Sequence, residues 1–250
     1  MKKIYITTDI HNFMHYSEEH KAGFSDETSH LIKYLDLAKE CWIKVTIFVT
    51  WKLLEDKQLI YKEILSKYDV EIWWHTYDCY TNYFKWTWFI YKKLCGCAYW
   101  TKKKQNSDIH KTTMALNKIW ILPTSWRTHA YASNSSTREL LLQHWYKIIS
   151  DLSEKKYQYK WLLEFPPNTL PDHENIIHPG IKNHPWANLS IKEWLLNIQN
   201  QILNQDESVV LAHATCHKYI DDFKTLEKLF NWIKENQYKT LLMKDKIWKI

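Results

Sequence analysis

The sequence predicts an α/β fold in which β-strands and α-helices alternate along a single domain. Short runs of β-branched and aromatic residues alternate with stretches whose apolar residues recur at helical spacing. This alternation is typical of a parallel sheet or a barrel. No segment rich in proline, glycine or serine interrupts residues 1–250, so we expect one domain across the whole chain.

The elements follow one another in a regular order. Strands are predicted at residues 3–8, 43–50, 69–74, 119–126, 147–150, 160–164, 208–212 and 239–243. Helices are predicted at about residues 26–41, 55–67, 108–118, 135–144, 190–204 and 220–236. The 78–104 segment is a long aromatic insertion, and loops of this length usually form lids or partner surfaces. We therefore expect residues 80–91 to stack on sugar rings or to seal a dimer, and the 80–104 insertion is the expected oligomer surface.

Composition and charge exclude several classes of protein. The net charge of +6 arises from basic and acidic residues spread along the chain without a basic stripe, which argues against nucleic-acid binding. Five cysteines, an odd number, do not form a disulfide framework pattern and suggest a reducing compartment. The sequence runs from Met1 into a strand without a signal peptide, and no apolar run has membrane-spanning length. We expect a cytoplasmic protein without a membrane span.

Polar residues capable of chemistry follow almost every predicted strand. They are Asp9, His75, Arg127, Asp151 and His213. The carboxyl ends of the strands of a (β/α) barrel converge on one face, where active sites are built, whereas core packing does not require this pattern. The sequence therefore predicts an enzyme.

A metal site is predicted where the third strand ends. His75, Asp78 and Cys79 lie within five residues, and each side chain presents a lone pair to a divalent cation. The alternative is a hydrogen-bonded histidine at a strand end.

Six segments resemble, in order, the motifs of the polysaccharide deacetylases of carbohydrate esterase family 4, the NodB homology domain. They are Y-I-T-T-D at 5–9, I-K-V-T-I-F-V-T-W-K-L-L at 43–54, E-I-W-W-H-T-Y-D-C at 71–79, S-W-R-T-H-A-Y at 125–131, K-I-I-S-D at 147–151 and V-V-L-A-H at 209–213. The resemblance implies a deformed (β/α)7 barrel, similar to a TIM barrel. It also implies a divalent-metal site that hydrolyses N-acetyl or O-acetyl groups of a sugar or glycan.

The resemblance implies a role for each matched residue. Asp9 corresponds to the general base, and Arg127 would hold Asp9 ionised. His213 corresponds to the general acid, and Asp151 would tune His213 or Arg127. Two plainer interpretations remain open: a structural salt bridge between Arg127 and Asp151, and a strand-end histidine at position 213.

The metal and substrate motifs depart from the family pattern. Ile10 occupies the place of a metal-binding aspartate, and His11 is the nearest substitute. Cys79 stands where a second histidine is usual, so the expected ligands are His11, His75 and either Cys79 or Asp78, with Asp9 as a bridging candidate. This set is softer than the usual one and favours zinc. In the third motif the expected substrate-binding residues are His129, Ala130 and Tyr131, with backbone N–H groups of the last two stabilising an oxyanion.

These observations favour a zinc-dependent deacetylase acting on a carbohydrate or an acetylated amino sugar. One alternative is a hydrolase of non-peptide C–N bonds in small amides. Another is a catalytically dead barrel that binds carbohydrate.

The glycine and tryptophan contents are abnormal. The chain has 3 glycines and 15 tryptophans, whereas average composition predicts roughly 17 glycines in 250 residues. Trp42 and Trp145 stand just after predicted helices, where glycine is the usual residue, and Trp51, Trp73 and Trp74 stand where we expect tight turns. Our hypothesis is that most of these tryptophans are glycine in the native protein, encoded by a recoded stop codon. The alternative is a tryptophan-rich carbohydrate binder.

Overall fold

The fold is α/β, a deformed (β/α)7 barrel, as the sequence predicts. The computed structural model describes residues 1–11, 27–76, 90–91, 93–97, 101–117, 124–151, 161–179 and 185–249. Within these residues the sheet has the strand order β6-β5-β4-β3-β2-β1-β7, and β8 also pairs with β1. The strands are β1 Lys3–Ile10, β2 Val45–Val49, β3 Val70–Trp74, β4 Ser125–Trp126, β5 Ile148–Ile149, β6 Leu163–Glu164, β7 Glu207–Leu211 and β8 Lys239–Thr240.

The chain divides into two compact units. The first unit comprises Met1–Ile47, Ile64–Glu71 and Pro167–Leu242, and the second comprises Phe48–Glu63, Ile72–Pro166 and Met243–Ile250. The expectation of one domain over residues 1–250 remains a prediction. Among the described residues, no helix is both long and apolar enough to cross a membrane.

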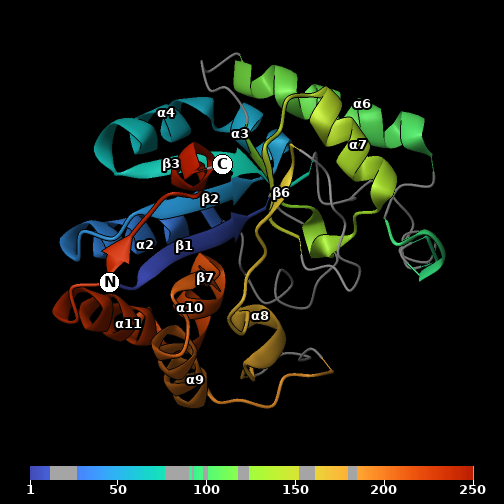
Figure 1. Cartoon of the computed structure of the whole chain (residues 1–250). Coiled ribbons are helices and arrows are strands. Elements are labelled where there is room, and N and C mark those ends of the chain that lie inside the picture. The colour runs from blue at the N-terminus through green and yellow to red at the C-terminus, as the bar shows by residue number, and fades with distance from the viewer. Residues whose placement is uncertain are drawn as a thin grey trace. The chain divides into compact units, whose positions relative to one another are not determined.

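The first unit is built around β1, which pairs in parallel with β7 and β8. Its helices are α2 Glu27–Glu40, α8 Asp172–Asn175, α9 Ile191–Leu203, α10 Ala214–Asp221 and α11 Lys224–Glu235. Figure 1 shows α9, α10 and α11 beside β7, with α11 packing on both neighbouring helices. The apolar face of α11 recurs at helical spacing through Leu226, Leu229, Phe230 and Ile233, all fully buried.

The second unit contains the parallel strands β3 to β6, which pair in sequence order. Its elements also include α3 Trp51–Asp56, most of α4 Gln58–Lys67, α6 Lys102–Asn117, η1 His129–Tyr131, α7 Ser135–Gln143 and η2 Met243–Lys249. Figure 1 shows α6 lying along α7. Helix α7 starts at a capping box in which the Asn134 side chain accepts from the Thr137 backbone and the Thr137 side chain accepts from the Asn134 backbone.

Two expected helices are divided in the structure. The helix predicted at 220–236 is two helices, α10 and α11, because Asp222 and Phe223 both adopt left-handed backbone conformations between them. The helix predicted at 55–67 begins at Trp51 and is broken at Lys57, which caps α3 before α4 starts. The short helix α8 lies in a segment that we expected to be a loop. Most of the 80–104 insertion, the expected oligomer surface, lies outside the described residues.

Candidate active site

Strand β1 of the first unit carries two candidate residues at its carboxyl end. Asp9 lies within the strand and is only 5% exposed. His11 follows the strand, and its backbone N–H donates to Glu27 Oε2 at 2.5 Å. The His11 Nδ1 atom lies 3.3 Å from the same oxygen, so Glu27 at the start of α2 fixes both the backbone and the ring of His11.

His213 follows β7 and caps the amino end of α10. Its Nδ1 atom lies 2.6 Å from Asp172 Oδ1, and its backbone N–H donates to Asp172 Oδ2 at 2.6 Å. The other ring nitrogen, Nε2, lies 3.9 Å from Asp9 Oδ2. The two predicted proton-transfer residues of this unit, Asp9 and His213, are therefore neighbours.

The protonation of His213 is set by its carboxylate neighbours. Burial alone would lower the pKa of His213, but the charge and hydrogen bond of Asp172, with the charges of Asp9 and Glu27, raise it to about 9. Burial pushes the pKa of Asp172 upward, and the charges of His213 and His217 outweigh burial and hold it below its ordinary value. The imidazolium form of His213 thus prevails at neutral pH.

Asp172 is a candidate functional residue that the sequence analysis does not identify. It is completely buried at the start of α8, and its Oδ2 atom lies 3.5 Å from His217 Nε2. The ligand atoms of Asp172, His213 and Cys216 lie within 4.8 Å of one another, a spacing that could hold a metal ion. One feature of the sequence points to this position: an acidic residue directly after a proline, Pro171, is typical of the first turn of a helix.

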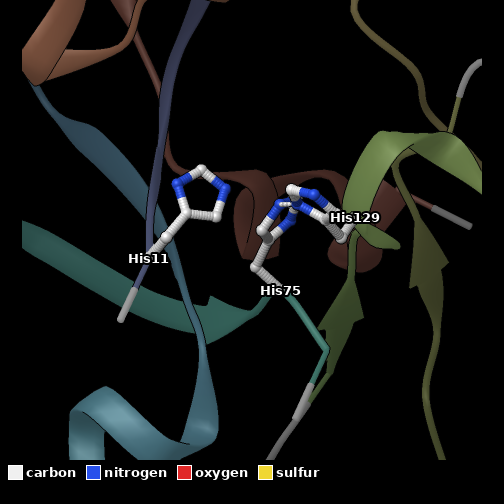
Figure 2. A group of neighbouring side chains, drawn as sticks. All are labelled: His11, His75 and His129. Atoms are coloured by element: carbon white, nitrogen blue, oxygen red, sulfur yellow. Dashed lines mark hydrogen bonds between the residues drawn. The ribbon is translucent and has the colours of Figure 1, made fainter. Parts of the chain in front are cut away.

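In the second unit, His75 and His129 lie together. His75 follows β3, is 2% exposed, and its backbone N–H donates to the Val49 carbonyl. His75 Nε2 lies 3.1 Å from His129 Nδ1, and the rings meet edge to face at 5.1 Å. Figure 2 shows the rings of His75 and His129 facing each other.

Arg127 and Asp151 hold the loop that precedes His129. The Arg127 guanidinium donates to the carbonyl and hydroxyl oxygens of Ser150 and lies over the ring of Phe48. Asp151 Oδ1 accepts the backbone N–H of Thr128 at 2.6 Å. Burial raises the pKa of Asp151, although its hydrogen bonds oppose the shift. The structure shows these two residues organising a turn, and their predicted catalytic roles remain predictions.

The predicted oxyanion turn has an unusual backbone. Ala130 and Tyr131 have φ values of 51° and 53°, in the left-handed region. The Tyr131 N–H donates to the Thr128 carbonyl at 2.8 Å, so this group is used within the turn. Substrate binding by these residues remains a prediction. Two predicted metal ligands, Asp78 and Cys79, lie outside the described residues.

Several solved structures are similar to this chain. No protein-family model and no curated protein sequence matches the chain. The catalytic domain of peptidoglycan N-acetylglucosamine deacetylase from Eubacterium rectale matches with a TM-score of 0.57 and 16% identity, over 97% of this chain and 88% of that one. A CE4 family pseudoenzyme from Bacillus anthracis matches with a TM-score of 0.62 and 11% identity. That match covers 98% of this chain but only 64% of the pseudoenzyme.

This chain has the fold of the CE4 polysaccharide deacetylases. The PuuE allantoinase also matches, with a TM-score of 0.70 and 11% identity over 97% of this chain and 88% of the allantoinase. The fold resemblance drawn from the sequence motifs is therefore confirmed. At identities of 11% to 16%, these matches show only the fold. The activity must be inferred from the chain's own residues.

Proposed function

We propose that this chain is a metal-dependent hydrolase that removes acetyl groups from a carbohydrate, with an acetylated amino sugar as the substrate class. The observation that carries the proposal is the arrangement of Asp9, His213 and Asp172. A carboxylate and an imidazole 3.9 Å apart, with the imidazole held by a second buried carboxylate, form a base and an acid in one place.

The donor atoms of the chain fit a divalent cation. His75 offers an imidazole whose Nε2 atom already faces another nitrogen at 3.1 Å, and imidazole is a ligand that zinc accepts readily. Of the ligands expected from the sequence, we propose His75 as the one that holds the cation, and Asp78 and Cys79 lie outside the described residues. A divalent cation bound there would polarise the acyl carbonyl and lower the pKa of an attacking water.

The chain's own residues would then move the protons. The Asp9 carboxylate accepts the proton of the attacking water. The Nε2–H of His213 donates a proton to the leaving amine, a role that requires an imidazolium at the working pH. The pKa of about 9 keeps His213 charged for this step, and Asp172 fixes the ring so that Nε2 faces the reacting groups. Arg127 and Asp151 would hold the loop that precedes His129.

Release of acetate tests the proposal. We would incubate the zinc-supplied chain with N-acetylglucosamine oligomers and measure acetate. Asp9→Asn and His213→Gln should each lower kcat by about 100-fold or more, the usual loss when a general base or acid is removed. The control is His110→Gln, an exposed histidine on α6. If the zinc-loaded chain releases no acetate from N- or O-acetylated sugars, the proposal is wrong.

A second candidate is a hydrolase of small non-peptide amides. The match to the PuuE allantoinase favours it, because that fold is shared at a TM-score of 0.70. The same zinc-loaded chain would then release ammonia or a carboxylate from small cyclic or linear amides and leave acetylated sugars intact. A chain that binds sugar but hydrolyses neither class would match the pseudoenzyme interpretation instead.

A further inference from the structure

The motif that begins at His75 lacks its second histidine. Cys79 stands at that position, and the next histidine along the chain is His110, on α6. A metal held through His75 therefore needs a ligand from another part of the chain, or the thiolate of Cys79. The described residues of the second unit contain one histidine close enough to serve, His129.

The spacing of the two rings suits a shared metal. Two nitrogens bound to one zinc at 2.0–2.1 Å in tetrahedral geometry lie about 3.4 Å apart. His75 Nε2 and His129 Nδ1 lie 3.1 Å apart, with the ring planes at 76°. A small outward movement of either ring would place a cation between the nitrogens. The same distance also allows a hydrogen bond between two neutral rings, and metal affinity distinguishes the two arrangements.

The backbone beside each histidine is held in an unfavourable conformation. Thr76, directly after His75, has a φ of 65°, which is rare for a β-branched residue. Ala130 and Tyr131, directly after His129, also lie in the left-handed region. Such backbone conformations are unfavourable and persist where the surrounding structure fixes them, often at ligand sites.

Specific contacts fix the position of His129. The residue before it, Thr128, donates its backbone N–H to the buried Asp151 carboxylate, and its hydroxyl accepts from Trp126 Nε1 at 2.9 Å. These bonds connect the turn to Trp126 of β4 and to Asp151, two residues after β5, and the two strands pair with each other. A ligand position held in this way loses little freedom when a cation binds.

We infer that His129 is a metal ligand together with His75, taking over the role of the histidine that Cys79 replaces. The inference rests on the proposed metal-dependent function and reassigns His129 from substrate contact to metal ligand. It implies that the Cys79 thiol is dispensable for metal binding. His11, the further ligand expected from the sequence, belongs to the other unit, and the inference does not depend on it.

Metal binding itself provides the test. Zinc affinity, measured by competition with a chromophoric chelator, should fall about 100-fold or more in His129→Ala and in His75→Ala, since each loses a ligand. Cys79→Ser and the control His110→Ala should bind as the unaltered chain does. Circular dichroism would establish that each variant is folded before its affinity is compared.

Cobalt provides a second measurement of the same ligand position in the folded variants. Cobalt(II) bound to nitrogen and oxygen ligands lacks the near-ultraviolet charge-transfer band of a cobalt–thiolate bond. His129→Cys should gain that band, because the new thiolate takes the ligand position, whereas the unaltered chain should lack it. A band in the unaltered chain that disappears in Cys79→Ser, with normal zinc affinity in His129→Ala, would overturn the inference.

The outcomes also separate this inference from the proposed function. Tight zinc binding that needs His75 and His129, without hydrolysis of any acetylated sugar, would support the ligand assignment and contradict the deacetylase. Zinc-dependent acetate release that persists with unchanged zinc affinity in His129→Ala would support the deacetylase and overturn the ligand assignment.

Discussion

Two exposed tryptophans occupy backbone positions that suit glycine. Trp42 and Trp145 have φ values of 58° and 67°, and their side chains are 81% and 77% exposed. In both places the following residue donates its N–H to the carbonyl five residues earlier: Ile43 to Ala38, and Tyr146 to Leu141. This is the Schellman arrangement, in which the left-handed residue after a helix is usually glycine.

Substitution by glycine at these positions should stabilise the protein. Trp42→Gly and Trp145→Gly should each raise the free energy of unfolding by about 1 kcal/mol, because a left-handed conformation penalises any residue with a Cβ. Urea denaturation measures the change. The matched controls are Trp42→Ala and Trp145→Ala, which remove the exposed ring but keep the Cβ. Equal stabilisation by alanine and glycine would show that the backbone is not the cause.

The backbone conformation favours glycine at positions 42 and 145 but not at positions 51, 73 and 74. Trp51 is the first residue of α3, and Trp73 and Trp74 are buried inside β3, so the tight turns expected at these positions are wrong. The strand continues through both residues, and the left-handed residue comes later, at Thr76. Peptide masses from the native protein would decide positions 42 and 145 directly, and tryptophan at both would contradict recoding there.

At the scale of elements, periodicity predicted the long helices and the buried strands well. The helix at 190–204 matches α9, which starts at the capping box of Ser190 and Glu193, and the strand at 208–212 matches β7 within one residue. The four-residue helix α8 is too short to show a helical period. Its Asp172 meets His213 only through tertiary packing across 41 residues of sequence, so no local pattern could reveal the pair.

The ion pair between α7 and β6 should be important for stability. Arg138 on α7 has a fully buried side chain, and its Nε atom donates to Glu164 Oε1 of β6 at 2.6 Å. Glu164→Gln should cost about 3 kcal/mol in urea denaturation, because a buried guanidinium loses its charged partner.

The double variant Arg138→Met/Glu164→Gln separates the pair from the packing. Removing both charges should cost less than Glu164→Gln alone, since no uncompensated charge stays buried. If the double variant is the less stable of the two, the cost of Glu164→Gln comes from lost contacts rather than from an unpaired charge.

At the scale of the whole molecule, the sequence predicts which polar residues follow the strands. It does not predict which side chains these residues bond to in the folded chain. His213 follows β7, as the sequence predicts, and its Nε2 atom lies 3.9 Å from Asp9 Oδ2. Its carboxylate partner is Asp172, and Asp151 instead accepts the N–H of Thr128. Strand ends can be found from hydrophobic patterns, whereas contacts between loops depend on the folded chain and leave no periodic signal.

The buried pair of Asp172 and His213 should make global stability depend on pH. The pKa of His213 rises from 6.5 to about 9 on folding, so its stabilising contribution is complete below pH 6.5 and is lost as the pH rises through 9. The pKa of Asp172 is lowered, so its contribution is present above its ordinary value of 3.8 and is lost on acidification. Stability should therefore be highest between these two ranges.

Urea denaturation of the chelator-treated protein at several pH values tests this dependence. The free energy of unfolding should fall by up to about 3 kcal/mol between pH 6.5 and pH 9, the value that corresponds to the shift of His213. Asp172→Asn should be less stable at pH 6.5 and should flatten the decline, because the asparagine cannot hold the imidazolium charged. His110→Gln should keep the decline of the unaltered chain. An equally steep decline in Asp172→Asn would show that other groups titrate over this range, and that Asp172 does not control the charge of His213.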